Sequence, residues 1–284
     1  MTYKLTKLSI IFFLLVQVSY GQWNKGKGNG YYKLAASSLV ADEHFTSAKE
    51  KDPNVTRGNF VVSAYGEYGL TDKVDLIAYI PLLSRVYQNK QISGNTGNVI
   101  QEGESVNSVG DIDIGVRYGL FKNDNLALSA TLKLGLPTGK KVGGTDGSLQ
   151  TGDGEFNQLL QLDLGIPFKI SNQNLYAKIY SGFNNRTEGF SDEFHFGGEI
   201  GTKIAAKLFI AAKLSNIRSL NNGNLTGTGQ GIFANNVEST NLGGELAYYV
   251  TKKFGLMVNY TSILSGKITY AAPNYTAGLF LDIQ

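Results

Sequence analysis

The sequence of 284 residues contains no cysteine, only five prolines and only two histidines, His44 and His195. Without cysteine, the chain cannot be a small exported domain that disulfide bonds hold together. Long apolar runs are also missing. After the first 21 residues every apolar stretch is interrupted within a few residues, whereas a membrane-spanning helix needs roughly 20 apolar residues. These absences exclude a disulfide-rich domain and a helical membrane protein.

Charge of either sign is scarce and balanced. The chain has 26 basic and 23 acidic residues, and removal of Lys4 and Lys7 with a leader leaves 24 basic residues against the same 23 acidic ones. The sequence contains no basic block and no acidic tail, which are the charge patterns of interaction tails. We therefore expect no nucleic acid among the partners of this protein.

The first residues have the pattern of a secretory signal peptide. Lys4 and Lys7 form a basic region, the apolar stretch 8–16 follows it, and Ser19 and Gly21 place small residues at positions −3 and −1 of a cleavage site. A basic region, a short apolar stretch and small residues, in this order, are the features of a cleaved signal peptide. The protein is therefore expected to be exported.

An N-terminal transmembrane anchor is the alternative explanation of the same residues. Such an anchor needs roughly 20 apolar residues, but Gln17 interrupts the apolar stretch well before that length. We therefore expect residues 1–21 to be removed, so that the mature chain begins near Gln22. Residues 22–30 would then form a short periplasmic segment, and residues 31–284 would form the folded domain.

Apolar and polar residues alternate over many segments of the remaining chain. In the stretch 126–136 one face carries mainly leucine, and the other face carries small, polar and charged side chains. Successive side chains of a β-strand point to opposite faces, so this alternation predicts strands with one apolar and one polar side. The pattern predicts twelve strands, near residues 31–45, 58–70, 74–87, 110–121, 126–137, 156–169, 175–186, 194–204, 208–220, 239–250, 254–265 and 274–283.

The connectors between these strands alternate between short and long. Turns of three or four residues, such as 71–73 and 122–125, alternate with long segments rich in Gly, Asn and Ser, such as 88–109 and 138–155. Short periplasmic turns and long extracellular loops are typical of outer-membrane barrels. An even number of strands also returns both ends of the chain to the periplasm.

A soluble exported β-sandwich would show a similar alternation. Its strands, however, average five or six residues, whereas a tilted membrane-crossing strand needs about ten, which the predicted strands reach. Aromatic residues near the strand ends, among them Tyr31, Tyr32, Tyr248 and Tyr249, are typical of girdles at the membrane interfaces. We therefore expect an all-β protein, a closed antiparallel transmembrane β-barrel of about twelve strands. It would lie in the lipid of the outer membrane of a Gram-negative bacterium, inserted there by the barrel-assembly machinery.

Two motifs carry a resemblance to a known family. Gly-Asp-Ile-Asp-Ile-Gly at 110–115 opens one predicted strand, and Leu-Gly-Leu-Pro-Thr-Gly at 134–139 closes the next one. These stretches resemble the outer-membrane barrel family named for the MetA pathway of phenol degradation, whose members are related in concept to hydrocarbon-uptake channels. The resemblance extends over most of the mature chain and implies a barrel that passes small, apolar or aromatic molecules. It assigns no binding residue in this sequence.

Candidates for catalysis and for cofactor binding are few. His195 precedes Phe-Gly-Gly-Glu, whereas the twelve-stranded lipases of the outer membrane carry a serine shortly after their histidine. The glycine-rich runs 26–30 and 139–144 lack the Gly-Lys-Ser/Thr ending of a phosphate-binding loop. Acidic loop residues such as Asp153 and Glu155 are calcium ligands by chemistry, but spaced acidic loops are more often just solvated. We therefore expect no catalytic residue, no cofactor and no bound metal.

Alternation sends charged side chains of both signs to the inner face of the predicted barrel. Such charges either pair across strands and fill the interior, or line water in a narrow channel. The sequence leaves both possibilities open. The residues expected to line the lumen are Asp75, Asp113, Arg117, Lys133, Asp163, Lys178, His195, Glu199, Lys203, Lys213 and Glu245.

These expectations lead to three candidate functions. The first is an outer-membrane channel for the passive uptake of small molecules, with apolar or aromatic molecules implied by the resemblance. The second is a barrel with a closed lumen that acts through its extracellular loops, in adhesion or as a structural protein. An outer-membrane lipase comes third, because the serine of such lipases is missing after His195.

The alternation of connectors also predicts which end of the barrel faces the outside of the cell. Epitope tags inserted at Gly97 and Gly229, both in long connectors, are expected to bind antibodies on intact cells. Labelling only after the outer membrane is permeabilised would overturn this topology.

Overall fold

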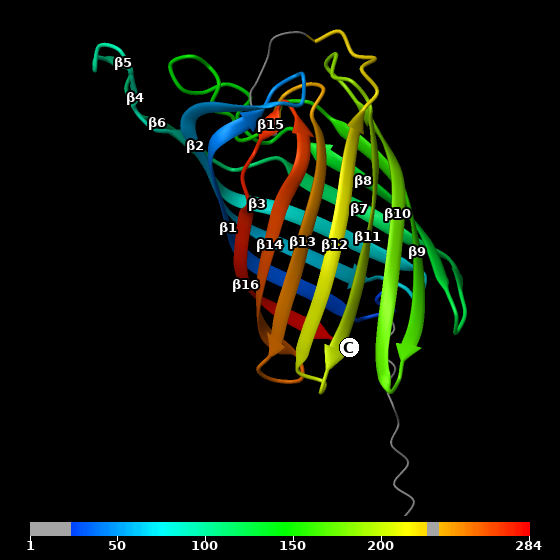
Figure 1. The fold of residues 1–284 in the computed structure, drawn as a ribbon. Helices are drawn as coiled ribbons and strands as arrows, with labels where there is room; N and C mark the ends of the chain where they lie inside the picture. Colours follow the sequence, from blue (N-terminus) through cyan, green and yellow to red (C-terminus); the bar gives the residue numbers. More distant parts are fainter. Residues whose placement is uncertain (1–23, 226–232) are drawn as a thin grey trace, which may run out of the picture.

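The computed structural model describes residues 24–225 and 233–284, so the expected signal peptide at 1–21 lies outside the described residues. Within the described residues, twelve long antiparallel strands form one closed barrel (Figure 1). This confirms the fold class and the number of strands expected from the alternation. The barrel strands are β1 (Gly30–Phe45), β2 (Lys51–Gly69), β3 (Val74–Gln88), β7 (Ile112–Lys122), β8 (Ala127–Leu136), β9 (Asn157–Ile170), β10 (Gln173–Arg186), β11 (Glu193–Ile204), β12 (Leu208–Ser219), β13 (Glu238–Tyr249), β14 (Phe254–Lys267) and β16 (Asn274–Ile283).

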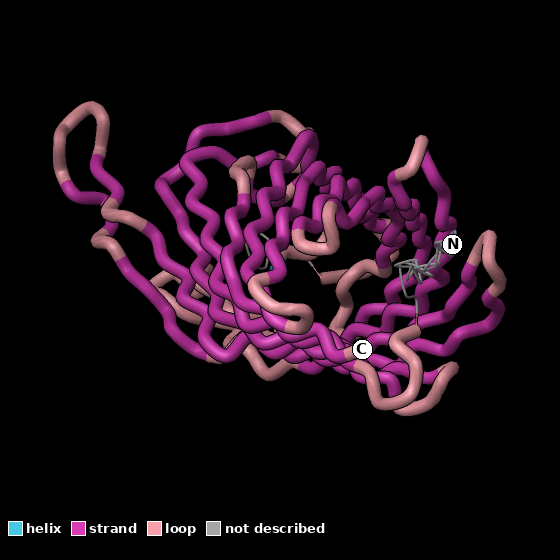
Figure 2. The backbone as a smooth tube through the Cα atoms, turned by 90° about the horizontal axis from the view of Figure 1, so that it is seen from below, coloured by secondary structure: helices cyan, strands magenta, loops and turns pink. Residues whose placement is uncertain are grey.

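Each barrel strand pairs with the barrel strands next to it in the chain, and the first strand also pairs with the last. β1 and β16 are in register from Gly30 opposite Ile283 to Leu39 opposite Asn274. The view from below shows the strands arranged around a central axis (Figure 2). Because the sheet closes on itself, no row of unpaired N–H and C=O groups faces the lipid.

β2 begins at Lys51, whereas the alternation predicted a start near residue 58. The pairing of β1 with β2 continues past a bulge between Ala41 and Glu43 and extends as far as Phe45 opposite Lys51. Backbone hydrogen bonds therefore continue this ladder where side-chain polarity no longer indicates a strand. The sequence also did not predict the short strands β4 (Gln91–Ile92), β5 (Val99–Gln101), β6 (Glu104–Ser108) and β15 (Thr269–Tyr270), which lie in long loops.

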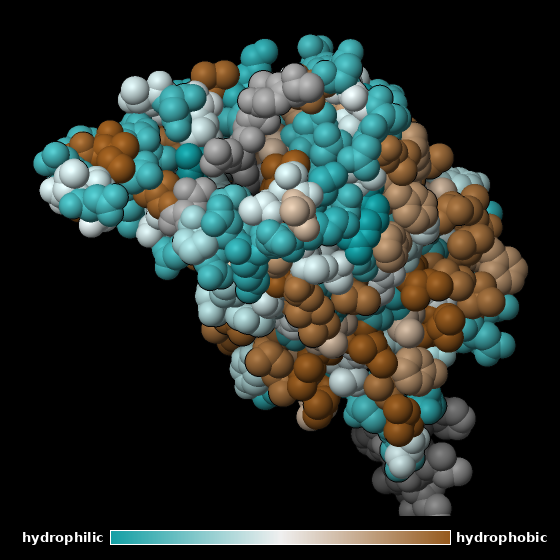
Figure 3. Space-filling view, turned by 45° about the horizontal axis from the view of Figure 1, so that its top comes forward, coloured by the Kyte–Doolittle hydropathy of each residue, from teal (hydrophilic) through white to brown (hydrophobic). Residues whose placement is uncertain are grey.

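Hydrophobic side chains cover the outer face of the barrel wall, whereas hydrophilic ones cover the long loops (Figure 3). Leu132, Leu162 and Val258 on this face are 48%, 51% and 52% exposed. Monomeric soluble proteins rarely expose apolar surface this extensively, which marks it as a face that meets lipid. No helix within residues 24–225 and 233–284 has the length and the apolar content for a membrane crossing. The outer wall therefore matches the hydrocarbon layer of a membrane.

The long loops lie at one end of the barrel, and the short turns lie at the other end together with the C terminus (Figure 1). At the short-turn end, the segment 24–29 folds back onto the barrel. The N–H of Gly28 donates to the carbonyl of Gly69 (2.8 Å), and the N–H of Gly69 donates to the carbonyl of Asn29 (2.9 Å). A Cβ on Gly69 would lie 1.9 Å from the carbonyl oxygen of Gly26. Only glycine therefore leaves room for this segment.

Two neighbouring residues of β8 face opposite sides of the barrel wall, so an arginine introduced at one is predicted to have a very different effect from an arginine introduced at the other. Leu132 faces outward and is 48% exposed, whereas Lys133 faces inward and forms an ion pair with Asp113. Leu132→Arg places a charge in the lipid and is expected to destabilise the barrel by roughly 2–4 kcal/mol near the membrane midplane. Lys133→Arg is the matched control and is expected to leave stability nearly unchanged. Urea unfolding in lipid vesicles measures both variants, and equal losses would show that the facing of β8 is wrong.

Candidate functional site in the barrel interior

Ion pairs that join non-adjacent strands show which side chains occupy the barrel interior. The guanidinium of Arg117 on β7 lies 3.3 Å from Glu67 on β2 and 3.4 Å from Asp75 on β3. Because β3 separates β2 from β7 in the sheet, Arg117 reaches Glu67 only across the inner face. The Asp75 carboxylate is fully buried and accepts the backbone N–H of Lys25 at 3.0 and 3.1 Å. The N-terminal segment thus closes over this side of the interior.

A second network lies on the opposite wall. Lys213 on β12 is 2.7 Å from Glu245 on β13 and 3.5 Å from Glu199 on β11. Lys33 on β1 lies 4.0 Å from the same Glu245, although β16 and β14 separate β1 from β13. The hydroxyl of Tyr176 donates to Glu199. Positive and negative side chains therefore alternate around this part of the inner wall.

Two further pairs differ in how deeply their carboxylates are buried. Lys178 lies 3.0 Å from Asp163, whose side chain is only 1% exposed and also accepts the hydroxyl of Thr131 at 3.3 Å. Lys133 lies 3.2 Å from Asp113, and these side chains are 38% and 31% exposed. Asp163 is therefore part of the packed wall and its partner Lys178 is 25% exposed, whereas both members of the second pair are open to the interior space.

The last two of the expected lumen residues have other partners. The ammonium of Lys203 lies 3.4 Å above the ring of Tyr249, and Nε2 of His195 lies 2.8 Å from the carboxylate of Glu193. The structure thus gives a definite place and partner to every residue that the alternation sent inward. That these residues line the path of a solute stays a prediction.

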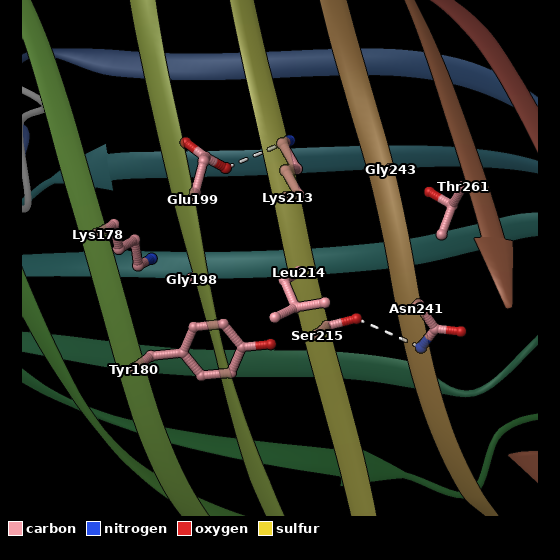
Figure 4. Close-up of a pocket in the computed structure, with 10 residues that line it drawn as sticks. All are labelled: Lys178, Tyr180, Gly198, Glu199, Lys213, Leu214, Ser215, Asn241, Gly243 and Thr261. Carbon is pink, nitrogen blue, oxygen red and sulfur yellow. Dashed lines mark hydrogen bonds and ion pairs between the residues drawn. The ribbon is translucent and has the colours of Figure 1, made fainter. Parts of the chain in front are cut away.

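A cavity of about 190 Å³ lies against the inner wall formed by β10 to β14. Figure 4 shows its lining, with Lys178 and Tyr180 on one side, Asn241 and Thr261 on the other, and Lys213 between them. The ring of Tyr180 lies over a neighbouring strand, where a Cβ on Gly197 would be 2.6 Å from its hydroxyl oxygen. Hydroxyl, amide and charged groups predominate among the side chains that line the cavity.

The sequence analysis missed an aromatic cluster inside the barrel near the short-turn end. The ring of Phe280, 2% exposed, lies 4.8 Å from that of Tyr249 and 5.8 Å from that of Tyr31. Tyr31 and Tyr249 therefore belong to the interior and not to the membrane girdle in which they were expected. Their neighbours Tyr32 and Tyr248 do face outward, with 36% and 48% exposure. A strict count of alternation from the outward leucines of β16 identifies Phe280 as an inward residue.

At the other end, the loop 138–156 reaches over the inner face of the barrel. Ser148 in this loop accepts a hydrogen bond from Arg57 on β2 at 2.9 Å, although β7 and β3 separate β8 from β2. Leu149 is 1% exposed, and Thr145 donates its backbone N–H to Glu104 at 2.6 Å. The loop therefore narrows the entrance from the long-loop side, which the sequence did not indicate.

The acidic loop residues that were considered as calcium ligands form ion pairs with an arginine. Arg186 on β10 is 5% exposed in its side chain and lies 2.9 Å from Asp153, 2.6 Å from Glu155 and 2.8 Å from Glu193. Across the part of the chain that the structure describes, no group of three or more His, Cys, Asp or Glu side chains is arranged to hold a metal ion. The role of these carboxylates here is to anchor the loop to the rim.

Asp111 fastens the base of the same loop. Its carboxylate accepts the backbone N–H of Gly139 at 2.8 Å and that of Asp153 at 2.9 Å. Burial raises the pKa of Asp111 to about 6, against these two hydrogen bonds, and the nearby Asp153 carboxylate raises it further. Burial also raises the pKa of Asp153. The two carboxyl groups therefore compete for ionisation where the loop meets the rim.

No protein-family model and no curated protein match this sequence. The fold is similar to the COG4313 outer membrane channel from Pseudomonas putida F1, with 17% identity, a TM-score of 0.65, and coverage of 94% of this chain and all of that one. Weaker similarity connects it to the NanC porin (8% identity, 88% and 99% coverage, TM-score 0.49) and to the CymD monoaromatic hydrocarbon channel (9% identity, 91% and 89% coverage, TM-score 0.41). The chain therefore has the fold of outer-membrane barrels and is a protein of the Gram-negative outer membrane. The resemblance to the phenol-degradation family is supported at the level of fold, and membership in that family stays a prediction.

The raised pKa of Asp111 predicts that low pH tightens the loop 138–156. A carboxyl with a folded pKa of about 6 against an ordinary value of 3.8 binds its proton more strongly when the loop is docked. The contribution of this proton to the stability of the docked loop is full below pH 3.8 and is lost as the pH rises through 6. Because the chain has no cysteine, a nitroxide at Val142→Cys reports on this loop alone.

The mobility of that nitroxide is expected to increase between pH 5 and pH 7.5 in the parent. Asp111→Asn is expected to remove most of this pH dependence, whereas Asp124→Asn, in a short turn at the other end, should leave it intact. The same pH dependence in all three proteins would show that another group controls the loop.

Proposed function

We propose that the protein is an outer-membrane channel for the passive passage of small solutes. The observation that carries this proposal is the cavity of about 190 Å³ on the inner wall, with its polar and charged lining. The side chains of Lys178, Glu199 and Lys213 at this cavity remain 25%, 24% and 34% exposed. A barrel whose only task is stability gains more from a dry, filled interior, whereas polar groups left open to the lumen are typical of channels.

Three features limit the proposed channel to small solutes. Twelve strands form a barrel between the side-chain-filled eight-stranded type and the open sixteen-stranded porins. The loop 138–156 lies over part of one entrance and is held there by Arg57. The cluster around Phe280 occupies interior space near the other end. We therefore propose a narrow passage in which each solute contacts the wall.

Two sets of observations bear on the chemical class of the solute, and they favour different classes. The resemblance of the sequence implies apolar or aromatic solutes, and the rings of Tyr31, Tyr249 and Phe280 offer an aromatic surface near the periplasmic end. The central cavity, in contrast, presents charged and hydrogen-bonding side chains. A hydrocarbon would displace water from these groups without replacing its hydrogen bonds. The cavity therefore favours a solute with polar groups.

A barrel with a closed lumen that acts through its loops is the second candidate. It is favoured by the buried cluster of Arg117, Glu67 and Asp75, over which the segment 24–29 is folded. If interior pairing of this kind extended across the whole cross-section, no solute would pass. The projecting hairpin of β4 and β5 (Figure 1) would then be a candidate contact surface for adhesion.

Ion conductance separates the two candidates, and two lysines provide a matched test. Lys133 and Asp113 are both partly exposed, so Lys133→Gln is expected to retain stability and to shift the reversal potential toward cation selectivity, because the interior loses a fixed positive charge. Lys178→Gln leaves the buried Asp163 without this partner and is expected to cost up to about 3–5 kcal/mol of stability. Planar bilayers measure the reversal potential, and urea titration measures stability. A correctly folded parent protein that shows no conductance would disprove the channel and favour the loop-acting barrel.

A further inference from the structure

Three charged side chains of alternating sign stand in one row on the wall of the cavity. Lys178 on β10 is the register partner of Glu199 on β11, and Glu199 is the register partner of Lys213 on β12. Neighbouring strands are roughly 4.8 Å apart, so the row presents positive, negative and positive groups at that spacing. Figure 4 shows all three side chains on the same wall, with Glu199 joined to Lys213 by an ion pair.

Buried carboxylates on the neighbouring strands hold the two lysines in place. Asp163, paired with Lys178, is 1% exposed, and Glu245, paired with Lys213, is 6% exposed. The lysines themselves are 25% and 34% exposed, and Glu199 is 24% exposed. A solute in the cavity therefore meets two ammonium groups and one carboxylate, whereas the other two carboxylates are buried beside the lysines and do not line the cavity.

The uncharged part of the lining carries side chains that form hydrogen bonds. Asn241 donates to Ser215 at 3.3 Å, and Thr261 donates to Asn259 at 3.0 Å. Gly243 is the register partner of both Lys213 and Thr261, and the Thr261 hydroxyl lies 2.8 Å from where a Cβ on this glycine would be. With a volume of about 190 Å³, the cavity has room beside the charged row for a small polar molecule.

We infer that this cavity is a transient binding site for small zwitterions of the amino-acid type, an inference that rests on the proposed channel function. The ammonium group of the solute pairs with Glu199, and its carboxylate pairs with Lys178 or Lys213. Each contact is a charge-assisted hydrogen bond. A simple anion at this row meets Glu199 as a like charge, and a simple cation meets two lysines. A zwitterion satisfies both signs at neighbouring positions.

The ion pairs and hydrogen bonds of the charged row are compatible with release of the solute as well as with its binding. Each charged group in the row has another partner in the wall, because Lys178 pairs with Asp163 and Lys213 pairs with Glu245. The Tyr176 hydroxyl does the same for Glu199. A departing solute therefore leaves no isolated charge behind. Conduction requires sites that bind strongly enough to attract the solute and weakly enough to release it.

Two isomers give a matched test of this inference. Alanine is a zwitterion, and lactamide has the same atoms but carries no charge, so that size and mass are equal. In liposome swelling with the purified full-length protein, alanine is expected to enter about threefold faster than lactamide, since partly exposed ion pairs are individually weak. Glu199→Gln is expected to reduce the rate for alanine to that for lactamide.

Asp124→Asn is the control, because it removes an exposed carboxylate in a short turn away from the cavity; it should keep the ratio of the two rates. The change of gel mobility on heating verifies that each variant is folded. The comparison of the two isomers in the parent protein does not depend on any variant. Equal rates for both isomers in the parent would overturn the zwitterion site while leaving the channel in place. No swelling with either isomer would overturn the channel itself.

Discussion

The rest of this structure depends on one constraint, which is that backbone N–H and C=O groups within a membrane must find partners inside the protein. Twelve antiparallel strands meet this requirement because β1 pairs with β16 along Gly30–Leu39. Closure has a second consequence. Once the wall is continuous, every side chain faces either lipid or the interior, so polar residues on alternate positions can lie only inside. The charged lumen is thus a direct result of satisfying the backbone.

Charges confined to the interior must then be compensated there. Some of the compensating ion pairs are almost fully buried, and others are partly exposed to the interior space. Asp75, Asp163 and Glu245 are nearly inaccessible and each has a cationic partner, which stabilises the wall because an unpaired buried charge is costly. Lys133 and Glu199 remain partly open. The deep carboxylates therefore orient the lysines, and the open groups are available to a solute. One set of residues contributes both to packing and to the proposed passage.

The two ends of the barrel restrict this interior by different physical means. Near the short turns, the cluster around Phe280 fills space with apolar rings, and the segment 24–29 adds backbone hydrogen bonds to Asp75. Near the long loops, Arg186 and Asp111 anchor the loop 138–156 through charged and backbone contacts. Charged contacts respond to pH and to salt, whereas apolar packing does not. The long-loop end is therefore held mainly by contacts that depend on pH and salt, and the short-turn end combines one such contact with apolar packing.

The sequence by itself determined the barrel, the number of its strands and the facing of most side chains, because the period of two is a local property that each strand displays. It also predicted which charged residues would line the lumen, and that part stays a prediction. Only the tertiary structure decided that Lys33 lies near Glu245 across two intervening strands. The same holds for the packing of Phe280 against Tyr31 and Tyr249 and for the contact of the loop 138–156 with β2. These contacts depend on the register between strands and on the curvature of the closed sheet. Both arise from many pairings acting together, and no single stretch of sequence contains them.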